Sequence, residues 1–378
     1  MANHLFSRRN FLSVLATTSA AAGASAQIPA DDYFREFTAD EYPALRSLSR
    51  PDSSGPRDPD QPIKILCTEN LSPEQIRRIK SAGKNLELHL VENSLDSAPV
   101  EEAEVILGWA DGATIRRAKK LKWVQVFAAG VENMPEELKV HTCKLTNMQR
   151  VFAPVIAESA IGLLLSLTRG LTQVSIPAFR EKKWTHAPDD VALDDLYGKT
   201  IAIVGMGGIG SETARRLHYG FNMKVLGTDP KPMPRPDFVK ELRDPSWLME
   251  MVQEADVLMS AAPLTQETRK MFNEQVFQAM KRTAYFINVS RGGLVDQPAL
   301  VSALKSKKIR GAGLDVASPE PLPASDPLWT CPNLVITPHN SSAAPSRTIR
   351  LTELVVENMR RYSQDLPLLN VVDKQRGY

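Results

Sequence analysis

The stretch Thr200–Leu217, which reads TIAIVGMGGIGSETARRL, decides the fold. Its first residues are β-branched or small and apolar and predict a buried strand, and the residues after Gly210 predict a helix. Between them stand Gly205, Gly207 and Gly210, in the spacing G-x-G-x-x-G. In this setting the first glycine permits a tight turn, the second lets a bound group approach the backbone, and the third lets the helix pack on the strand.

An acid at the end of the next strand completes the pattern. Asp229 follows Gly210 at about the 20-residue interval of dinucleotide-binding turns. The backbone N–H groups of Gly208 and Ile209, at the N-terminus of the predicted helix, would face a pyrophosphate. The Asp229 carboxylate can accept hydrogen bonds from both ribose hydroxyls and would repel a 2′-phosphate. The turn therefore predicts a dinucleotide, NAD before NADP, although Lys231 and Arg235 follow closely and could attract a phosphate.

Strands and helices alternate on both sides of this turn. Short apolar runs bounded by polar or glycine positions predict strands, and longer stretches between them predict helices. The predicted strands span residues 63–67, 86–91, 104–109 and 122–127 before the turn, and 224–229, 256–262, 284–290, 311–316 and 334–339 after it. This βαβ order predicts an α/β protein with parallel sheets.

A helix predicted at 154–171 marks the domain boundary, because it is apolar nearly all round and suits burial between domains. The proline-rich, polar residues before 63 predict a linker or surface arm. The predicted organisation is a linker at 27–62, a first domain at 63–153, a second domain at 154–344, and a C-terminal helix and tail at 345–378 that return to the first domain.

The first residues have the pattern of an export signal. Arg8 and Arg9 precede a short run rich in Ala, Ser and Thr, and Ala24–Ala26 forms a small-residue cleavage site. The paired arginines resemble those of twin-arginine signals. We therefore expect residues 1–26 to be a signal peptide and the protein to be exported to the periplasm, with a cytoplasmic location as the alternative. No other segment approaches the ~20 apolar residues of a transmembrane helix.

Composition narrows the functional classes further. A chain of 378 residues has room for about two domains. The formal net charge is +2, and loss of residues 1–26 would remove Arg8 and Arg9, so nothing indicates a nucleic-acid partner. Cys67, Cys143 and Cys331 are odd in number and widely spaced, which favours buried apolar roles over a disulfide or metal framework, although an oxidising compartment would permit one pair.

Polar residues also follow the predicted strands of the second domain. Arg291 comes directly after the strand 284–290, Asp315 lies at the carboxyl end of the strand 311–316 with Glu320 beyond it, and His339 is the last residue of the strand 334–339. The carboxyl ends of parallel strands meet at one edge of a sheet, where open α/β sheets bind ligands. Arg291 carries a planar fork of donors that suits a carboxylate, no neighbour in its own stretch screens its charge, and the two glycines after it would let a ligand approach the backbone.

These residue types suggest a reaction on a 2-oxo acid. Arg291 would hold the carboxylate and polarise the keto oxygen. His339 would give a proton to that oxygen on reduction and remove one from the hydroxyl on oxidation, while Glu320 would bond the other imidazole nitrogen and stabilise the protonated ring. A dinucleotide would carry the hydride. Each residue alone has an ordinary structural explanation, and only their combination with the glycine turn indicates a dehydrogenase.

Five segments together extend the pattern: GMGGIG, APLTQETR, FINVSRGGLVD, GAGLDVASPEPLP and ITPHNSS. In this order and spacing, over roughly residues 63–378, the chain resembles the D-isomer-specific 2-hydroxyacid dehydrogenases. The resemblance implies two doubly wound parallel-sheet α/β domains, a Rossmann cofactor domain inserted into a flavodoxin-like substrate domain. It also implies NAD as cofactor, a small D-2-hydroxy acid or 2-oxo acid as substrate, and a homodimer.

The resemblance also assigns roles to single positions. It implies that the catalytic residues are Arg291, Glu320 and His339, and that the amides of Ala129 and Gly130, in FAAGVEN, bind the substrate carboxylate together with Arg291. The implied cofactor contacts are Gly205, Gly207, Gly208, Ile209, Gly210, Asp229, Pro263, Thr268, Ser290, Arg291 and Asp315. Asn340 and Ser341 depart from the family, which often has an aliphatic residue and a glycine there.

Two other functions stay open. The same fold serves as a dinucleotide-sensing interaction module in the C-terminal binding protein corepressors, and dehydrogenases of phosphite or formate also use an arginine for a small anion. Turnover on 2-oxo acids would separate these classes, because a sensor needs only binding. The acid itself is not identified and could be glyoxylate, hydroxypyruvate or a bulkier 2-oxo acid.

Overall fold

The computed structural model describes residues 60–91, 95, 98–188, 191 and 193–378. The signal peptide predicted at 1–26 lies outside the described residues, as does the predicted linker 27–62 except for its last residues, 60–62. The described residues form two parallel β-sheets and the helices that cover them.

The first sheet is parallel throughout and has the strand order β2-β1-β3-β4-β5. This is the flavodoxin-like order of a doubly wound sheet. Its strands are β1 (Ile63–Cys67), β2 (Leu86–Leu90), β3 (Val105–Leu107), β4 (Trp123–Gln125) and β5 (Lys144–Thr146). The helical segments between them are α3 (Pro73–Ser81), η3 (Val100–Glu102), α4 (Gly112–Arg117) and α5 (Glu136–Val140). Helix α3 begins with the capping box of Ser72 and Gln75 that its sequence indicates.

The second sheet is also parallel, in the order β12-β11-β10-β9-β6-β7-β8. Counted from β6, its first strands follow the order of the dinucleotide-binding fold, with a further strand at one edge. The strands are β6 (Thr200–Val204), β7 (Lys224–Thr228), β8 (Glu241–Arg243), β9 (Val257–Ser260), β10 (Tyr285–Asn288), β11 (Gly311–Leu314) and β12 (Leu334–Ile336). Both sheets match the predicted fold class.

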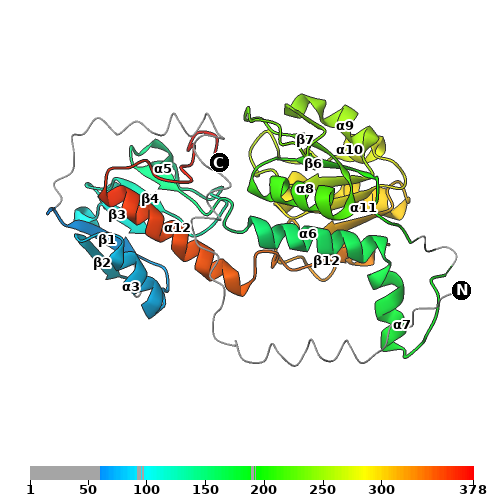
Figure 1. Ribbon diagram of the computed structural model, residues 1–378, viewed down its shortest axis with the longest axis horizontal. Coiled ribbons are helices and arrows are strands. Elements are labelled where there is room, and N and C mark those ends of the chain that lie inside the picture. The colour runs from blue at the N-terminus through cyan, green and yellow to red at the C-terminus, as the bar shows by residue number, and fades with distance from the viewer. Residues whose placement is uncertain (1–59, 92–94, 96–97, 189–190, 192) are drawn as a thin grey trace, which may run out of the picture. The chain divides into compact units, whose positions relative to one another are not determined.

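Helices cover both faces of the second sheet (Figure 1). One face carries α6 (Ala153–Thr168) and α8 (Gly208–Phe221), which contact each other. The other carries α9 (Leu248–Glu254), α10 (Glu274–Ala279) and α11 (Gln297–Lys305). There Phe286 of β10 packs on Phe272 and Phe277, with ring centroids 5.1 and 5.4 Å apart. The short helical segments η5 (Pro245–Trp247), η6 (Gly292–Leu294) and η7 (Pro327–Thr330) complete the connections.

Helix α6 corresponds to the apolar segment predicted at 154–171, and it contacts α8 and strands β10 and β11. Gly170, at φ 61°, ends it, and η4 (Leu171–Ser175) and α7 (Ile176–Arg180) follow. In the part of the chain that the structure describes, no single helix is long and apolar enough to cross a membrane. Among the described residues, α6 taken with residues 171–180, at a bend of 60°, is the only pair with the length and composition of a broken span.

The last helix, α12 (Pro345–Ser363), lies beside α3 of the first sheet (Figure 1). Its Asn358 side chain donates a hydrogen bond to Gln125 of β4 over 3.1 Å. The tail beyond it adds to the same sheet, because the Val372 amide donates to the Leu145 carbonyl over 2.8 Å. The C-terminal residues therefore pack on the elements formed by residues 63–146.

Two strands were not predicted, β5 and β8, and both are three residues long. Each places an apolar residue between polar ones, KLT and ELR, which is too short a run to show an alternating pattern. The predicted strands also extend too far at their carboxyl ends. Val289 and Ser290, for example, are buried but lie beyond the end of β10, since the chain stays in the protein interior as it enters the site loops.

Candidate active site

The glycine turn after β6 has the geometry that its spacing predicts. Gly205 has φ +94°, and a Cβ there would lie 2.8 Å from the Ala261 carbonyl carbon. A Cβ on Gly210 would overlap the Gly205 carbonyl oxygen, so the helix can approach the strand only without one. At Gly207 no heavy atom lies within 4 Å of the Cβ position. The open face at Gly207, where α8 begins, fits a phosphate group that approaches the backbone.

A cation that sequence reasoning missed stands beside this turn. The Cβ position of Gly208 lies 2.7 Å from Cγ of Arg150, which has a left-handed backbone at φ 69°. Arg150 also interacts electrostatically with Lys231. A guanidinium here would suit a bound diphosphate. The chain offers no local signal for it, because Arg150 belongs to the connection between β5 and α6.

Asp229 is held at the end of β7 by two backbone amides. Its Oδ2 accepts from the Met206 amide and its Oδ1 from the Lys231 amide, both over 2.9 Å. Burial raises the pKa of this carboxyl and lowers that of the Lys231 ammonium, whose Nζ lies 4.3 Å from the Tyr378 ring centroid. The carboxylate thus lies against the glycine turn, where dinucleotide-binding folds carry the acid that hydrogen-bonds the ribose.

His339 and Glu320 form a hydrogen-bonded pair. Nδ1 of His339 lies 2.7 Å from Oε2 of Glu320. The other carboxylate oxygen of Glu320 accepts from the Ala317 amide over 2.9 Å, so the glutamate is itself anchored. The contact occupies Nδ1 and leaves Nε2 as the nitrogen available to a substrate. Both side chains are partly open to solvent.

Asp315 organises the loop that carries this histidine. Only 1 % of Asp315 is exposed. Its carboxylate accepts from the Thr337 hydroxyl over 2.6 Å and from the amides of Asn340 and Ser341, both over 3.1 Å. Because the last two contacts come from the backbone, the unusual side chains at 340 and 341 leave this arrangement intact. His339 itself adopts the left-handed region at φ 51°.

Arg291 has hydrogen-bond partners in the structure. Its Nε donates to Oε1 of Glu132, and its Nη1 donates to the Ser290 carbonyl over 2.8 Å. The Ser290 hydroxyl is buried and bonds Asn288 over 2.9 Å and Ser260 over 2.7 Å. A buried network thus fixes the backbone at Arg291. Glu132 is the acid that screens the arginine, and it comes from the first sheet.

The glycine after Arg291 has a different role from the one expected. A Cβ on Gly292 would overlap the backbone carbonyl of Ala317. Protein therefore fills the space that the sequence suggested for a ligand. This glycine instead lets the loop after β10 pack against the loop after β11, which carries Glu320.

The remaining predicted contacts lie in two ordered loops. The Asn147 side chain donates to the Ala129 carbonyl over 2.6 Å and so holds the loop before Gly130, whose Cβ position abuts Arg291. In the loop after β9, the Thr268 hydroxyl donates to the Pro263 carbonyl over 2.7 Å.

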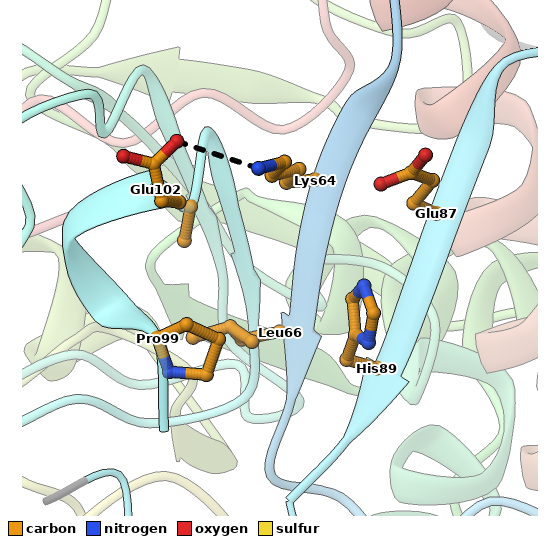
Figure 2. A pocket seen from close by; sticks show the side chains of 7 residues that line it. Lys64, Leu66, Glu87, His89, Pro99 and Glu102 are labelled. Atoms are coloured by element: carbon orange, nitrogen blue, oxygen red, sulfur yellow. Dashed lines mark hydrogen bonds and ion pairs between the residues drawn. The ribbon is translucent and has the colours of Figure 1, made fainter. Parts of the chain in front are cut away.

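Adjacent strands bring most of the predicted residues to one edge. Arg291, Asp315 and His339 follow β10, β11 and β12, which pair in that order, and the glycine turn follows β6 in the same sheet. A separate hollow lies over β1 and β2 (Figure 2). Its lining residues are Lys64, Leu66, Glu87, His89, Pro99, Glu102 and Ala103, and it contains no predicted site residue. Among the described residues, no group of three or more His, Cys, Asp or Glu side chains could hold a metal ion.

Comparison with known proteins identifies the family of the chain. Residues 161–341 match the family described as D-isomer specific 2-hydroxyacid dehydrogenase, NAD binding domain. A glyoxylate reductase of Korarchaeum cryptofilum is 38% identical over 269 residues, 70% of this chain and 80% of that protein. A glyoxylate/hydroxypyruvate reductase B of Escherichia fergusonii is 34% identical over 303 residues, 78% of this chain and 87% of that protein.

Solved structures show the same relationship. A D-isomer specific 2-hydroxyacid dehydrogenase from Xanthobacter autotrophicus, in complex with NADPH and MES, superposes with a TM-score of 0.73 at 27% identity, over 84% of this chain and all of that one. An NADPH-dependent glyoxylate/hydroxypyruvate reductase from Sinorhizobium meliloti, in complex with NADP and sulfate, gives 0.71 at 25% identity, over 84% and 100%. The chain therefore belongs to the family of D-isomer specific 2-hydroxyacid dehydrogenases, enzymes that depend on a nicotinamide dinucleotide.

Proposed function

We propose that the protein reduces a small 2-oxo acid, of the size of glyoxylate or hydroxypyruvate, to the D-2-hydroxy acid. The observation that carries this proposal is the His339–Glu320 pair, anchored at the same sheet edge as Arg291 and the glycine turn. The substrate size follows the relatives named glyoxylate reductase and glyoxylate/hydroxypyruvate reductase.

Each polar residue has one task in this reaction. Arg291 and the amides of Ala129 and Gly130 bind the carboxylate, which orients the keto carbon. His339 delivers a proton from Nε2 to the keto oxygen, and Glu320 stabilises the protonated ring through Nδ1. When bound, the nicotinamide dinucleotide would supply the hydride. The oxidation of a hydroxy acid uses the same groups in reverse.

Gly205, Gly207 and Gly210 would hold the pyrophosphate of the cofactor, with Arg150 available to its phosphates and Asp229 to its ribose. Asp229 favours NAD(H), because its carboxylate would repel a 2′-phosphate. Lys231 lies beside it and partly offsets that repulsion. We therefore propose a preference for NAD(H) with measurable use of NADP(H).

One experiment tests the reaction. The purified chain is assayed by loss of nicotinamide absorbance with NADH and with NADPH, across glyoxylate, hydroxypyruvate, pyruvate, phenylpyruvate and 2-oxoglutarate. Turnover of a small 2-oxo acid is the expected result. Absence of turnover with every acid, together with tight NADH binding measured by fluorescence, would contradict the proposal. That result would favour a dinucleotide sensor or a dehydrogenase of another anion.

We also propose a homodimer that buries exposed aromatic side chains on and after α7 and before β6. Three aromatic side chains there are strongly exposed: Phe179 by 84%, Trp184 by 102% and Tyr197 by 75%. Exposed aromatic side chains are enriched at protein–protein interfaces. Light scattering should give twice the chain mass, and Trp184→Glu should give the monomer. A monomeric wild-type protein would contradict the proposal.

Export remains a further proposal, supported by Arg8, Arg9 and the small residues at 24–26. The protein would take up its nucleotide before transport and carry it bound. Cell fractionation should place the mature chain in the periplasm, and replacing both arginines by lysine should keep it in the cytoplasm. Recovery of nucleotide-free protein with weak affinity for NAD(H) from the periplasm would argue against transport of a loaded enzyme.

A further inference from the structure

The ion pair between Glu132 and Arg291 joins the two sheets at the predicted acid-binding position. Glu132 follows β4 in the loop 127–133, and Arg291 follows β10. The two residues are 159 positions apart, and Nε of Arg291 donates to Oε1 of Glu132. Their side chains are 28% and 31% exposed, so the pair is partly open to solvent.

The Glu132 side chain stands on an anchored turn. Val131 and Met134 on either side are 2% and 5% exposed, and the Met134 amide donates to the Val131 carbonyl over 3.0 Å. The start of the loop is held as well, because the Met148 amide donates to the Ala128 carbonyl over 2.9 Å. The position of Glu132 therefore follows from the scaffold.

The carboxylate of Glu132 occupies the Nε side of the guanidinium. A Cβ placed on Gly130 would overlap both Oε2 of Glu132 and Nη2 of Arg291. Gly130, Glu132 and Arg291 thus surround one small space. The Nη1 atom of Arg291 is already turned to the Ser290 carbonyl. A second carboxylate can bind the Nε–Nη2 edge of the fork only if Glu132 gives up its hydrogen bond to Nε.

We infer that Glu132 is a specificity-determining residue, which holds Arg291 in the free enzyme and is displaced by the carboxylate of a small monocarboxylic 2-oxo acid. This inference rests on the proposed function, since it takes Arg291 as the acid-binding group. Displacement leaves one arginine facing two carboxylates, those of Glu132 and of the substrate. A substrate with a second carboxylate nearby would bring a third negative charge, and the site disfavours it.

The effect on catalysis should fall on binding. Glu132→Gln keeps the size of the side chain and one acceptor oxygen but removes its charge. The substrate then competes with a weaker partner, so KM for glyoxylate should fall about threefold to tenfold, the range for loss of a partly exposed ion pair. The value of kcat should stay near that of the wild type. The ratio of kcat/KM for glyoxylate to that for 2-oxoglutarate should fall by at least a similar factor.

The matched controls are Glu132→Asp and Glu136→Gln. The first keeps the charge on a shorter side chain and should retain the discrimination against 2-oxoglutarate. The second removes an exposed glutamate on α5 that pairs with Lys139, and it should change neither constant. Circular dichroism and NADH titration of each variant separate an effect at the site from loss of fold.

Direct binding keeps this test independent of turnover. Oxamate, a monocarboxylate that resembles a 2-oxo acid, is titrated against the NADH complex of the full chain by fluorescence quenching. Tighter oxamate binding by Glu132→Gln than by the wild type supports the inference even if the physiological acid is unknown. Equal or weaker binding, or a raised KM with a lowered kcat, overturns it and makes Glu132 a residue that positions Arg291. If the wild type reduces glyoxylate in that case, the proposed function stands without the inference.

Discussion

His339 and Glu320 lie 2.7 Å apart through Nδ1 and Oε2, and the glutamate is fixed by the Ala317 amide before it orients the ring. The loop of His339 is fixed separately, by the buried carboxylate of Asp315. Two carboxylates therefore position one imidazole: Glu320 bonds the ring and Asp315 bonds the backbone. The two constraints act on one residue and together fix the direction of its free nitrogen, Nε2.

Replacing His339 by glutamine should lower kcat at least about 100-fold, the scale of general acid–base catalysis, because glutamine cannot exchange a proton at Nε2. The dissociation constant for NADH should change little, since the glycine turn and Asp229 are untouched. Steady-state kinetics and fluorescence titration measure the two effects. His89→Gln, at an exposed position on β2, is the control and should match the wild type. An unaltered kcat in His339→Gln would show that this histidine is not the proton donor.

The variant Arg291→Lys keeps the charge but loses the planar fork of donors. We expect kcat/KM for the 2-oxo acid to fall about tenfold to a hundredfold, which corresponds to one or two charge-assisted hydrogen bonds. Affinity for NADH should persist. Wild-type kinetics in this variant would show that the substrate carboxylate is bound elsewhere.

Asp229 should make NADH binding depend on pH. Burial raises the pKa of its carboxyl above the usual value near 4, and the ribose hydroxyls need the ionised form as acceptor. As pH falls through the raised pKa, the carboxylate is protonated and NADH affinity declines, at a higher pH than an exposed aspartate would show. Asp229→Asn should abolish this dependence and narrow the preference for NADH over NADPH by about tenfold. Titrations with both cofactors between about pH 5 and 8 measure this dependence. If the affinity of the wild type for NADH does not change over this range, the ribose is bound by other residues.

The sequence allowed the fold to be predicted because its signals are local. Each of these signals involves only residues that are close in sequence. They are the alternation of apolar runs, the spacing of Gly205, Gly207 and Gly210, and the capping box at Ser72. The strands β5 and β8 were missed since three residues, one of them apolar, carry no period.

The site was predictable to the same extent. Arg291 and His339 each follow a strand of one parallel sheet, so strand order alone brings them to one edge. Glu132 and Arg150 could not be predicted, because they meet Arg291 and the glycine turn through the packing of chain segments that lie far apart in sequence. Tertiary packing, which no motif records, supplies these charges.

The three cysteines should differ in reactivity. Burial raises the pKa of the Cys67 and Cys143 thiols to about 11 each, so only about one in a thousand is ionised at pH 8. Cys331 is half-buried, and its pKa is raised as well. Ellman's reagent should therefore react slowly with one thiol in the folded protein and with three after unfolding. The replacement Cys331→Ser should remove the slow phase. Rapid reaction of Cys67 or Cys143, or a disulfide between them, would contradict this assignment.

Two glycines of one turn should separate stability from cofactor binding. Gly205 has φ +94°, and a Cβ there would lie 2.8 Å from backbone atoms of Ala261 and Ala262, so Gly205→Ala strains the turn and should destabilise the protein by about 1–3 kcal/mol. Gly207 has φ −65° and open space around its Cβ position. Gly207→Ala should therefore unfold at the wild-type temperature yet bind NADH at least about tenfold more weakly, because its methyl group takes the space of the pyrophosphate. Thermal unfolding without nucleotide and NADH titration measure the two effects. Wild-type NADH affinity in Gly207→Ala would show that the phosphates do not bind at this turn. A large loss of stability would show that Gly207, like Gly205, is needed for folding.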